Sequence, residues 1–175
     1  MGSSDWHLLS LVGKDRPGIV AKLSAGLCKN GCNLGDSSMA RLGSNFVIML
    51  AVQYPGSQEA LANVVAPLAG MLDLNQHIMK IEDGTHHIEP DVRINLFSED
   101  RMGIVEDATQ LLAEAGLNIL TLESNLDTNQ PNNSYTIHIE GNVSNGITPL
   151  YSVLDRLSTE KSIQSQLIPI NAQAT

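Results

Sequence analysis

One phrase of this sequence occurs twice, and the repeat constrains the fold more than any other feature does. Residues 15–34 read DRPGIVAKLSAGLCKNGCNL, and residues 100–119 read DRMGIVEDATQLLAEAGLNI. Eight of the twenty paired positions are identical, and each identical pair lies 85 residues apart. A repeat of this length indicates a duplicated domain rather than a short solenoid unit. We therefore expect two domains, residues 1–84 and residues 85–175.

Length and composition agree with two small domains. The chain has 175 residues, and 42% of them are hydrophobic, which is enough for packed cores. The stretch EDGTHHIEP, residues 82–90, contains turn-forming and charged residues and is expected to connect the two domains.

Strand-like and helix-like patterns alternate in the same order in both halves. Tyr135, Ile137 and Ile139 alternate with polar residues, as in a strand with one face in water. Ile19, Val20, Leu23 and Leu27 form the apolar stripe of a helix, and Pro17 suits its opening turn. The expected strands are residues 6–12, 33–42, 45–52 and 77–82 in the first half, and 92–97, 118–127, 134–140 and 163–168 in the second.

Each half therefore reads strand–helix–strand–strand–helix–strand. This order predicts an α+β protein of two ferredoxin-like (βαββαβ) domains, each an antiparallel sheet with two helices on one face. Pro67 falls inside the second helix of the first half and is expected to kink or break it. One open sheet face is too apolar to be left in water, so we expect domains or chains to pair, as in a homo-oligomer.

Charge and hydropathy narrow the function classes. The formal net charge is −9 and no dense Lys/Arg run occurs, which disfavours direct binding of nucleic acid. No segment has the roughly 18 uninterrupted apolar residues of a membrane span, and the first residues lack the pattern of a signal peptide. With only two cysteines, the chain is expected to be cytoplasmic with both thiols reduced.

The loop DRPGIV after the first strand, followed about thirteen residues later by Gly-x-Asn, resembles the ACT domain. Two such units in tandem resemble the glycine cleavage system transcriptional repressor family. The resemblance implies a non-catalytic regulatory protein that senses an amino acid, glycine first of all. It also implies action by contact with a protein partner, a DNA-binding activator, rather than with DNA.

In ACT domains the effector commonly lies against the loop between the first strand and the first helix, often where two domains meet. Carried over by position, the first site comprises Asp15, Arg16, Pro17, Gly18, Asn33 and Leu34, and the second comprises Asp100, Arg101, Met102, Gly103, Asn118 and Ile119. The chemistry is suitable, because a helix start can receive a carboxylate and Gly18 leaves room for it. Asp15 or Asp100 could accept hydrogen bonds from an ammonium group.

The same residues also have a purely structural interpretation. Asp15 would cap the helix, Pro17 would stiffen its entry, and Asn33 would close a turn. In the second copy Met102 replaces the proline, so the first copy is the better candidate for a ligand site.

Catalytic and metal motifs are not found. The sequence has no Gly-x-Ser-x-Gly elbow, His-Glu-x-x-His, phosphate loop or dinucleotide fingerprint, so we expect neither an enzyme nor a cofactor. Cys28 and Cys32 are expected to be small buried residues. His86 and His87 are expected to lie in a surface loop, and no metal site is predicted.

Two alternative functions stay open at this point. One is an interaction module whose ligand site has been lost, which Met102 favours. The other is an accessory regulatory subunit of an amino-acid or folate enzyme, because formyltetrahydrofolate deformylases carry a similar DRPGIV unit.

Overall fold

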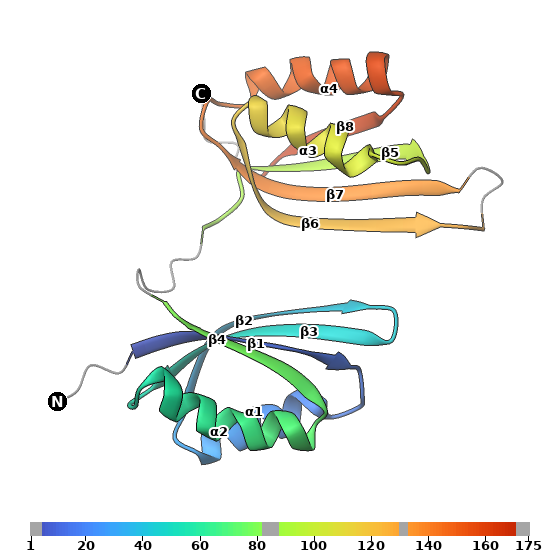
Figure 1. The fold of residues 1–175 in the computed structure, drawn as a ribbon. Helices are drawn as coiled ribbons and strands as arrows, with labels where there is room; N and C mark the ends of the chain where they lie inside the picture. Colours follow the sequence, from blue (N-terminus) through green and yellow to red (C-terminus); the bar gives the residue numbers. More distant parts are fainter. Residues whose placement is uncertain (1–4, 82–87, 130–132, 171–175) are drawn as a thin grey trace. The chain divides into compact units, whose positions relative to one another are not determined.

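The computed structural model describes residues 5–81, 88–129 and 133–170 (Figure 1). The chain divides into two compact units, Met1–His87 and Ile88–Thr175, each with its own sheet, helices and core. The expected boundary between residues 84 and 85 lies outside the described residues, as does most of the expected linker.

The two units contain the same six elements in the same order. The first unit has β1 (Asp5–Lys14), α1 (Ile19–Lys29), β2 (Asn33–Leu42), β3 (Asn45–Tyr54), α2 (Gln58–Met71) and β4 (Leu74–Lys80). The second unit has β5 (Val92–Glu99), α3 (Ile104–Glu114), β6 (Leu117–Asp127), β7 (Ser134–Val143), α4 (Thr148–Lys161) and β8 (Gln164–Pro169). The predicted α+β class and element order are confirmed in both units.

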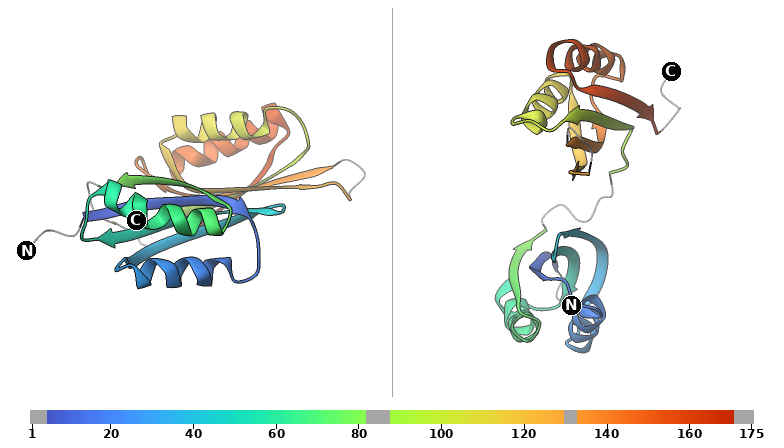
Figure 2. Two further views of the ribbon diagram at one scale, coloured as in Figure 1. Left: turned by 60° about the horizontal axis from the view of Figure 1, so that its bottom comes forward. Right: turned by 90° about the vertical axis from the view of Figure 1, so that its right-hand side faces the viewer.

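Each unit is a four-stranded antiparallel sheet with its two helices on one face (Figures 1 and 2). The strand order is β2-β3-β1-β4 in the first sheet and β6-β7-β5-β8 in the second. The first strand of each unit is therefore central, and the helix that follows it crosses one face of the sheet. This arrangement places the loop after the first strand beside the turn that joins the next two strands.

Alternation along the central strands builds the core on the helix side. Leu9 pairs with Leu50 in the first sheet, and both side chains are buried beneath the helices. Ile94 pairs with Ile139 in the second sheet, again with both side chains buried. Because neighbouring residues in a strand point to opposite faces, the intervening positions lie on the open face of each sheet.

The open faces of the two sheets differ in chemistry. On the first sheet, Val12, Met49 and Met79 are apolar and 45%, 41% and 49% exposed. On the second sheet, Arg93 forms a 2.6 Å ion pair with Glu140. The duplicated frame thus carries an apolar open face in one copy and a polar one in the other, and the expected apolar open face is that of the first unit.

Some local expectations were wrong. α2 continues through Pro67 without a break. Pro67 lies on the exposed side of the helix, where water can hydrogen-bond the carbonyl that it leaves without a donor. Val20 is 37% exposed and not part of the buried stripe. The fourth strand begins at Leu74, three residues before the expected start at residue 77.

The assignment of the two faces predicts unequal costs for two truncations in the first sheet. Leu9→Ala should lower the free energy of unfolding by about 2–5 kcal/mol, because it leaves a cavity in the core. Met49→Ala, on the partly exposed open face, should cost far less. Urea denaturation followed by circular dichroism measures both, and equal costs would contradict the assignment.

Candidate functional site

The loop after the first strand is a tight turn in both units. In the first unit the Ile19 amide donates to the Arg16 carbonyl at 3.1 Å, and Gly18 has φ 77° and ψ 8°. These values are those of the third residue of a type II turn, where glycine is preferred and proline favours the position before it. Gly103 has φ 86° and ψ 4° in the second copy.

The turn explains the motif without a helix cap from its aspartate. The N-cap of α1 is Gly18, and no side chain caps the helix, so the capping interpretation of Asp15 is wrong. Pro17 precedes the N-cap, so it stiffens the turn and lies outside the opening helical turn. A Cβ on Gly18 would meet nothing within 4 Å, so the glycine is required by its backbone angle and the space beside it is open.

The arginine of each turn reaches the end of the second helix of its unit. Arg16 Nη2 donates to the carbonyl of Leu72, the C-cap of α2. Arg101 Nη2 donates at 3.4 Å to the carbonyl of Lys161, the last residue of α4. Carbonyls at a helix C-terminus lack intrahelical donors and attract positive charge. The arginines therefore join two distant loops in each unit, a role that sequence reasoning did not predict.

The aspartate before each arginine attaches the turn to the neighbouring hairpin through its backbone. The Asp15 amide donates to the Ser44 carbonyl at 2.9 Å, and the Asp100 amide donates to the Asn133 carbonyl at 2.8 Å. The Asp15 carboxylate lies 3.3 Å from the guanidinium of Arg41. The candidate loop is thus held from two sides in both copies.

The second copy adds a carboxylate that the first copy lacks. Asp107 lies 2.8 Å from both Arg101 Nη2 and Lys161 Nζ. Hydrogen bonds from Lys161 and then Arg101 lower the pKa of Asp107 below its ordinary value. The residue 85 positions earlier is Lys22, which reverses the charge at this place in the first unit.

The other predicted site residues lie at the far end of each sheet. Asn33 pairs with Gln53, one residue before the end of β3. Lys14, just before the turn, pairs with Asn45, the first residue of β3. Eight strand steps separate these two positions, about 26 Å. One copy of the first unit therefore cannot bring Asn33 and the turn to a single small ligand.

The second unit repeats this separation. Asn118 pairs with Asn142 near the end of β7, whereas Glu99 pairs with Ser134 at its beginning. Leu34 and Ile119, which follow the two asparagines, are half-buried and pack against the cores of their units. Asn33 Nδ2 donates to Gln53 Oε1 at 3.2 Å.

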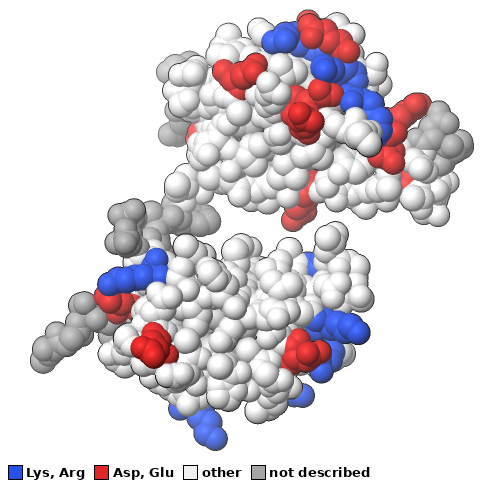
Figure 3. Space-filling model, viewed as in Figure 1, with Lys and Arg blue, Asp and Glu red and all other residues white. Residues whose placement is uncertain are grey.

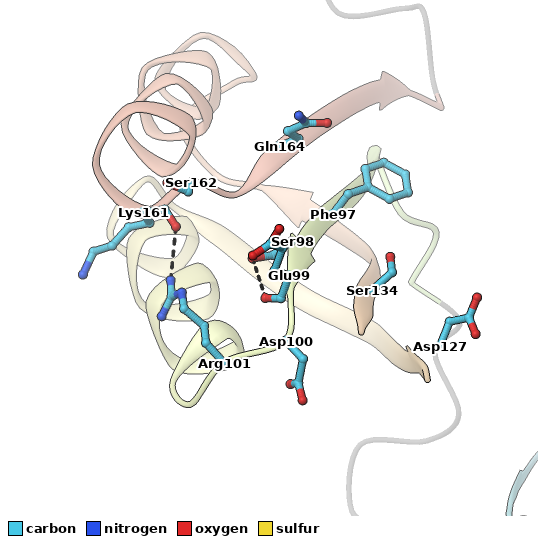
Figure 4. Close-up of a pocket in the computed structure, with 10 residues that line it drawn as sticks. All are labelled: Phe97, Ser98, Glu99, Asp100, Arg101, Asp127, Ser134, Lys161, Ser162 and Gln164. Carbon is cyan, nitrogen blue, oxygen red and sulfur yellow. Dashed lines mark hydrogen bonds between the residues drawn. The ribbon is translucent and has the colours of Figure 1, made fainter. Parts of the chain in front are cut away.

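An open cavity of about 890 Å³ lies beside the turn of the second unit (Figure 4). The cavity contains two of the predicted site residues, Asp100 and Arg101, whereas Met102 is 98% exposed and does not line it. The lining residues that sequence reasoning missed are Phe97, Ser98, Glu99, Asp127, Ser134, Lys161, Ser162 and Gln164. They come from strand ends and a helix end that only the tertiary fold brings together.

Metal-binding and redox alternatives find no support in the described part of the chain. Within residues 5–81, 88–129 and 133–170, no three His, Cys, Asp or Glu side chains form a group that could hold a metal ion. Cys32 is buried and Cys28 is exposed, so the expectation of two buried cysteines was wrong for Cys28. Burial raises the pKa of the Cys32 thiol. His86 and His87 lie outside the described residues.

Surface charge and helix lengths bear on other partners. On the face drawn in Figure 3, Lys and Arg are interspersed with Asp and Glu, and no broad basic surface is seen. Among the described residues, the helices are too short or too polar to cross a membrane.

Comparison with known proteins identifies the first unit. Residues 7–80 match the family model of the ACT domain. The glycine cleavage system transcriptional repressor of Escherichia coli (strain K12) is 23% identical over 180 residues, which cover 100% of this chain and 90% of that protein. The protein of the same description from Shigella flexneri matches equally.

Two solved structures share the fold of the whole chain. An unknown protein from Galdieria sulphuraria superposes with a TM-score of 0.79 at 22% identity, covering 95% of this chain and 99% of that one. A provisionally assigned glycine cleavage system transcriptional repressor superposes with a TM-score of 0.71 at 25% identity, covering 95% and 98%.

The lowered pKa of Asp107 predicts an acid-dependent loss of stability in the second unit. A carboxylate with a lowered folded pKa stabilises the fold above its unfolded pKa, near 4, and this contribution is lost as the pH falls through the folded value. Asp107→Asn should remove that part of the pH dependence. Thermal unfolding between about pH 6 and pH 2 measures it, with Asp155→Asn on α4 as the control. Parallel curves for wild type and Asp107→Asn would contradict the ion-pair account.

Proposed function

We propose that this chain, whose first unit is an ACT domain and whose second unit repeats the same fold, is a non-catalytic regulatory protein that senses an amino acid. Glycine is the first candidate effector. The proposed output is contact with a protein partner that controls transcription of glycine cleavage genes, in the cytoplasm. The observation that carries the proposal is the full-length similarity to glycine cleavage system transcriptional repressors.

The structure of the first loop supports an effector site there. The turn at Gly18 is open above its backbone, since a Cβ at that position would meet no atom within 4 Å. The turn also leads directly into α1, whose first amides lack intrahelical acceptors and can receive a carboxylate. Asp15 lies beside them and supplies an acceptor for an ammonium group. An amino acid carries both groups.

The separation within one unit supports a site that two copies of the chain complete. The turn at Asp15–Gly18 and the pair Asn33–Leu34 lie about 26 Å apart along the sheet, so one ligand contacts both only if they come from different copies. A ligand shared in this way favours the assembled state, because it binds that state more tightly than the separate chains. Effector binding would thereby change the surface offered to a protein partner.

The charge of the chain supports protein contact as the output. The net charge of −9 opposes broad binding to the phosphates of DNA. A repressor that acts on a DNA-binding activator needs no basic surface of its own.

Calorimetric titration of the full chain with glycine, serine and alanine tests the effector site. We expect glycine to release or absorb heat. Asp15→Asn should weaken binding at least roughly tenfold, because a hydrogen bond to a charged group contributes about 1.5–3 kcal/mol. Asp155→Asn on α4 serves as the matched control and should bind as wild type does. Absence of heat across the amino acids would contradict effector binding.

Mixing two variants tests whether copies share the site. Asp15→Asn and Asn33→Ala should each weaken binding alone. Co-expressed with different tags and purified as mixed assemblies, they should recover tight binding at a fraction of the sites, because one interface then joins two intact halves. Mixed assemblies that bind as weakly as each variant would show that the site is not shared between copies.

An interaction module without an effector site is the second candidate. The side chains of the first loop and its partners are engaged inside the unit: Asp15 pairs with Arg41, Arg16 donates to the Leu72 carbonyl, and Asn33 donates to Gln53. This candidate predicts partner binding that no amino acid alters, so the titration separates it from the leading proposal.

A further inference from the structure

The cavity of the second unit lies at the end of β5, between the hairpin of β6 and β7 on one side and the end of α4 on the other (Figure 4). Its volume of about 890 Å³ is in the range of small-molecule sites. Three structural elements that are distant in the sequence meet there, so the cavity is a product of the fold rather than of one loop.

An aromatic ring forms part of the lining. Phe97 is 40% exposed and lies on the open face of the sheet, opposite Gln164 of β8 and Thr136 of β7. A large apolar ring left partly exposed beside polar groups is suited to a ligand that covers it. The face of an aromatic ring attracts cations, most strongly where water is excluded.

The positive charges of the lining are directed away from the cavity. Lys161 Nζ lies 2.8 Å from Asp107, and Figure 4 shows its side chain extending away from the other lining residues. Arg101 donates to Asp107 at 2.8 Å and to the Lys161 carbonyl at 3.4 Å. Asp107, which is not a lining residue, therefore holds both cations on the helix side.

The negative charges of the lining outnumber the positive ones. The carboxylates are those of Glu99, Asp100 and Asp127, against the two cations Arg101 and Lys161. Asp127 Oδ1 is fixed at the hairpin by hydrogen bonds of 2.9 and 3.0 Å from Asn129. Since Asp107 already pairs with both cations, the field within the cavity favours a positively charged group.

The first unit has a different set of residues at the same places. Lys14 occupies the position of Glu99, and Val12 occupies that of Phe97, each 85 residues earlier. Leu42, which pairs with Asn45 at the hairpin end, stands where Asp127 pairs with Ser134. The acidic and aromatic lining thus belongs to the second copy, and the two copies do not offer the same chemistry to a ligand.

We propose that this cavity binds a ligand of net positive charge through a primary ammonium group, as found in diamines and basic amino acids. The ammonium group lies between the carboxylates of the rim and the face of Phe97. The inference rests on the proposed function, in that the loop after the first strand of each unit is a ligand site. It adds that the second site selects cations, so the two copies respond to different ligands.

A matched pair of probes tests the selectivity on the full chain. Cadaverine and glutarate have five-carbon chains with two positive or two negative ends. By calorimetry, cadaverine should bind and glutarate should not. Glu99→Lys, which installs the residue of the first copy, should weaken cadaverine binding at least roughly tenfold. Lys14→Glu, at the equivalent place of the first unit, should leave it unchanged.

A second variant separates a built site from general attraction to an acidic surface. Phe97→Val removes the ring without changing charge and again copies the first unit, so it should weaken cadaverine binding by several-fold if the ring contacts the ammonium group. Circular dichroism of each variant confirms that the fold is retained.

Three results would overturn the inference: no binding of cadaverine, equal binding of glutarate, or cadaverine binding that neither Glu99→Lys nor Phe97→Val changes. Glycine titrated in parallel separates the two proposals. If glycine binds and cadaverine does not, the effector proposal stands and the cation site fails. If neither binds, both fail.

Discussion

The rest of each unit depends on one tight turn between the first strand and the first helix. A glycine with positive φ lets the chain reverse, and the preceding arginine donates to carbonyls at the end of the second helix. The aspartate before it attaches the turn to the neighbouring hairpin through its amide. These bonds join the three loops at one end of the sheet, so the position of each loop constrains the other two. A ligand at the turn would therefore act on the whole end of the unit.

Duplication preserved this frame while the surfaces around it diverged. The turn, the arginine contact and the sheet order occur in both copies. The open sheet face is apolar in the first copy and polar in the second, and Lys22 of the first helix is replaced by Asp107. Core positions resist change because each is packed on all sides, whereas exposed positions on strand and helix ends tolerate a reversal of charge. Two similar units can in this way carry different binding properties.

Periodicity predicted the fold well, and it predicted the site less well. The alternation of Ile137 and Ile139 with polar residues, and the turn signal at Gly43-Ser44, are local patterns with a direct structural meaning, and both strands formed as expected. The arginine contacts were missed because Arg16 and Leu72 are 56 residues apart, and no local pattern links them. The cavity lining was missed for the same reason, although the exchange of Lys14 for Glu99 between the copies was visible in the aligned repeat. Asn33 was grouped with the turn by motif, yet the strand register places it at the other end of the sheet.

The central claim is that the first copy of the turn is an amino-acid site, and nuclear magnetic resonance tests it most directly. Amide spectra of the ¹⁵N-labelled full chain are recorded during titration with glycine. The account predicts shifts concentrated at Gly18 and Ile19, where the backbone would receive the carboxylate, and at Asn33 on the far end of the sheet, where a second copy would complete the site. Unchanged spectra, or shifts confined to residues away from both ends, would contradict it.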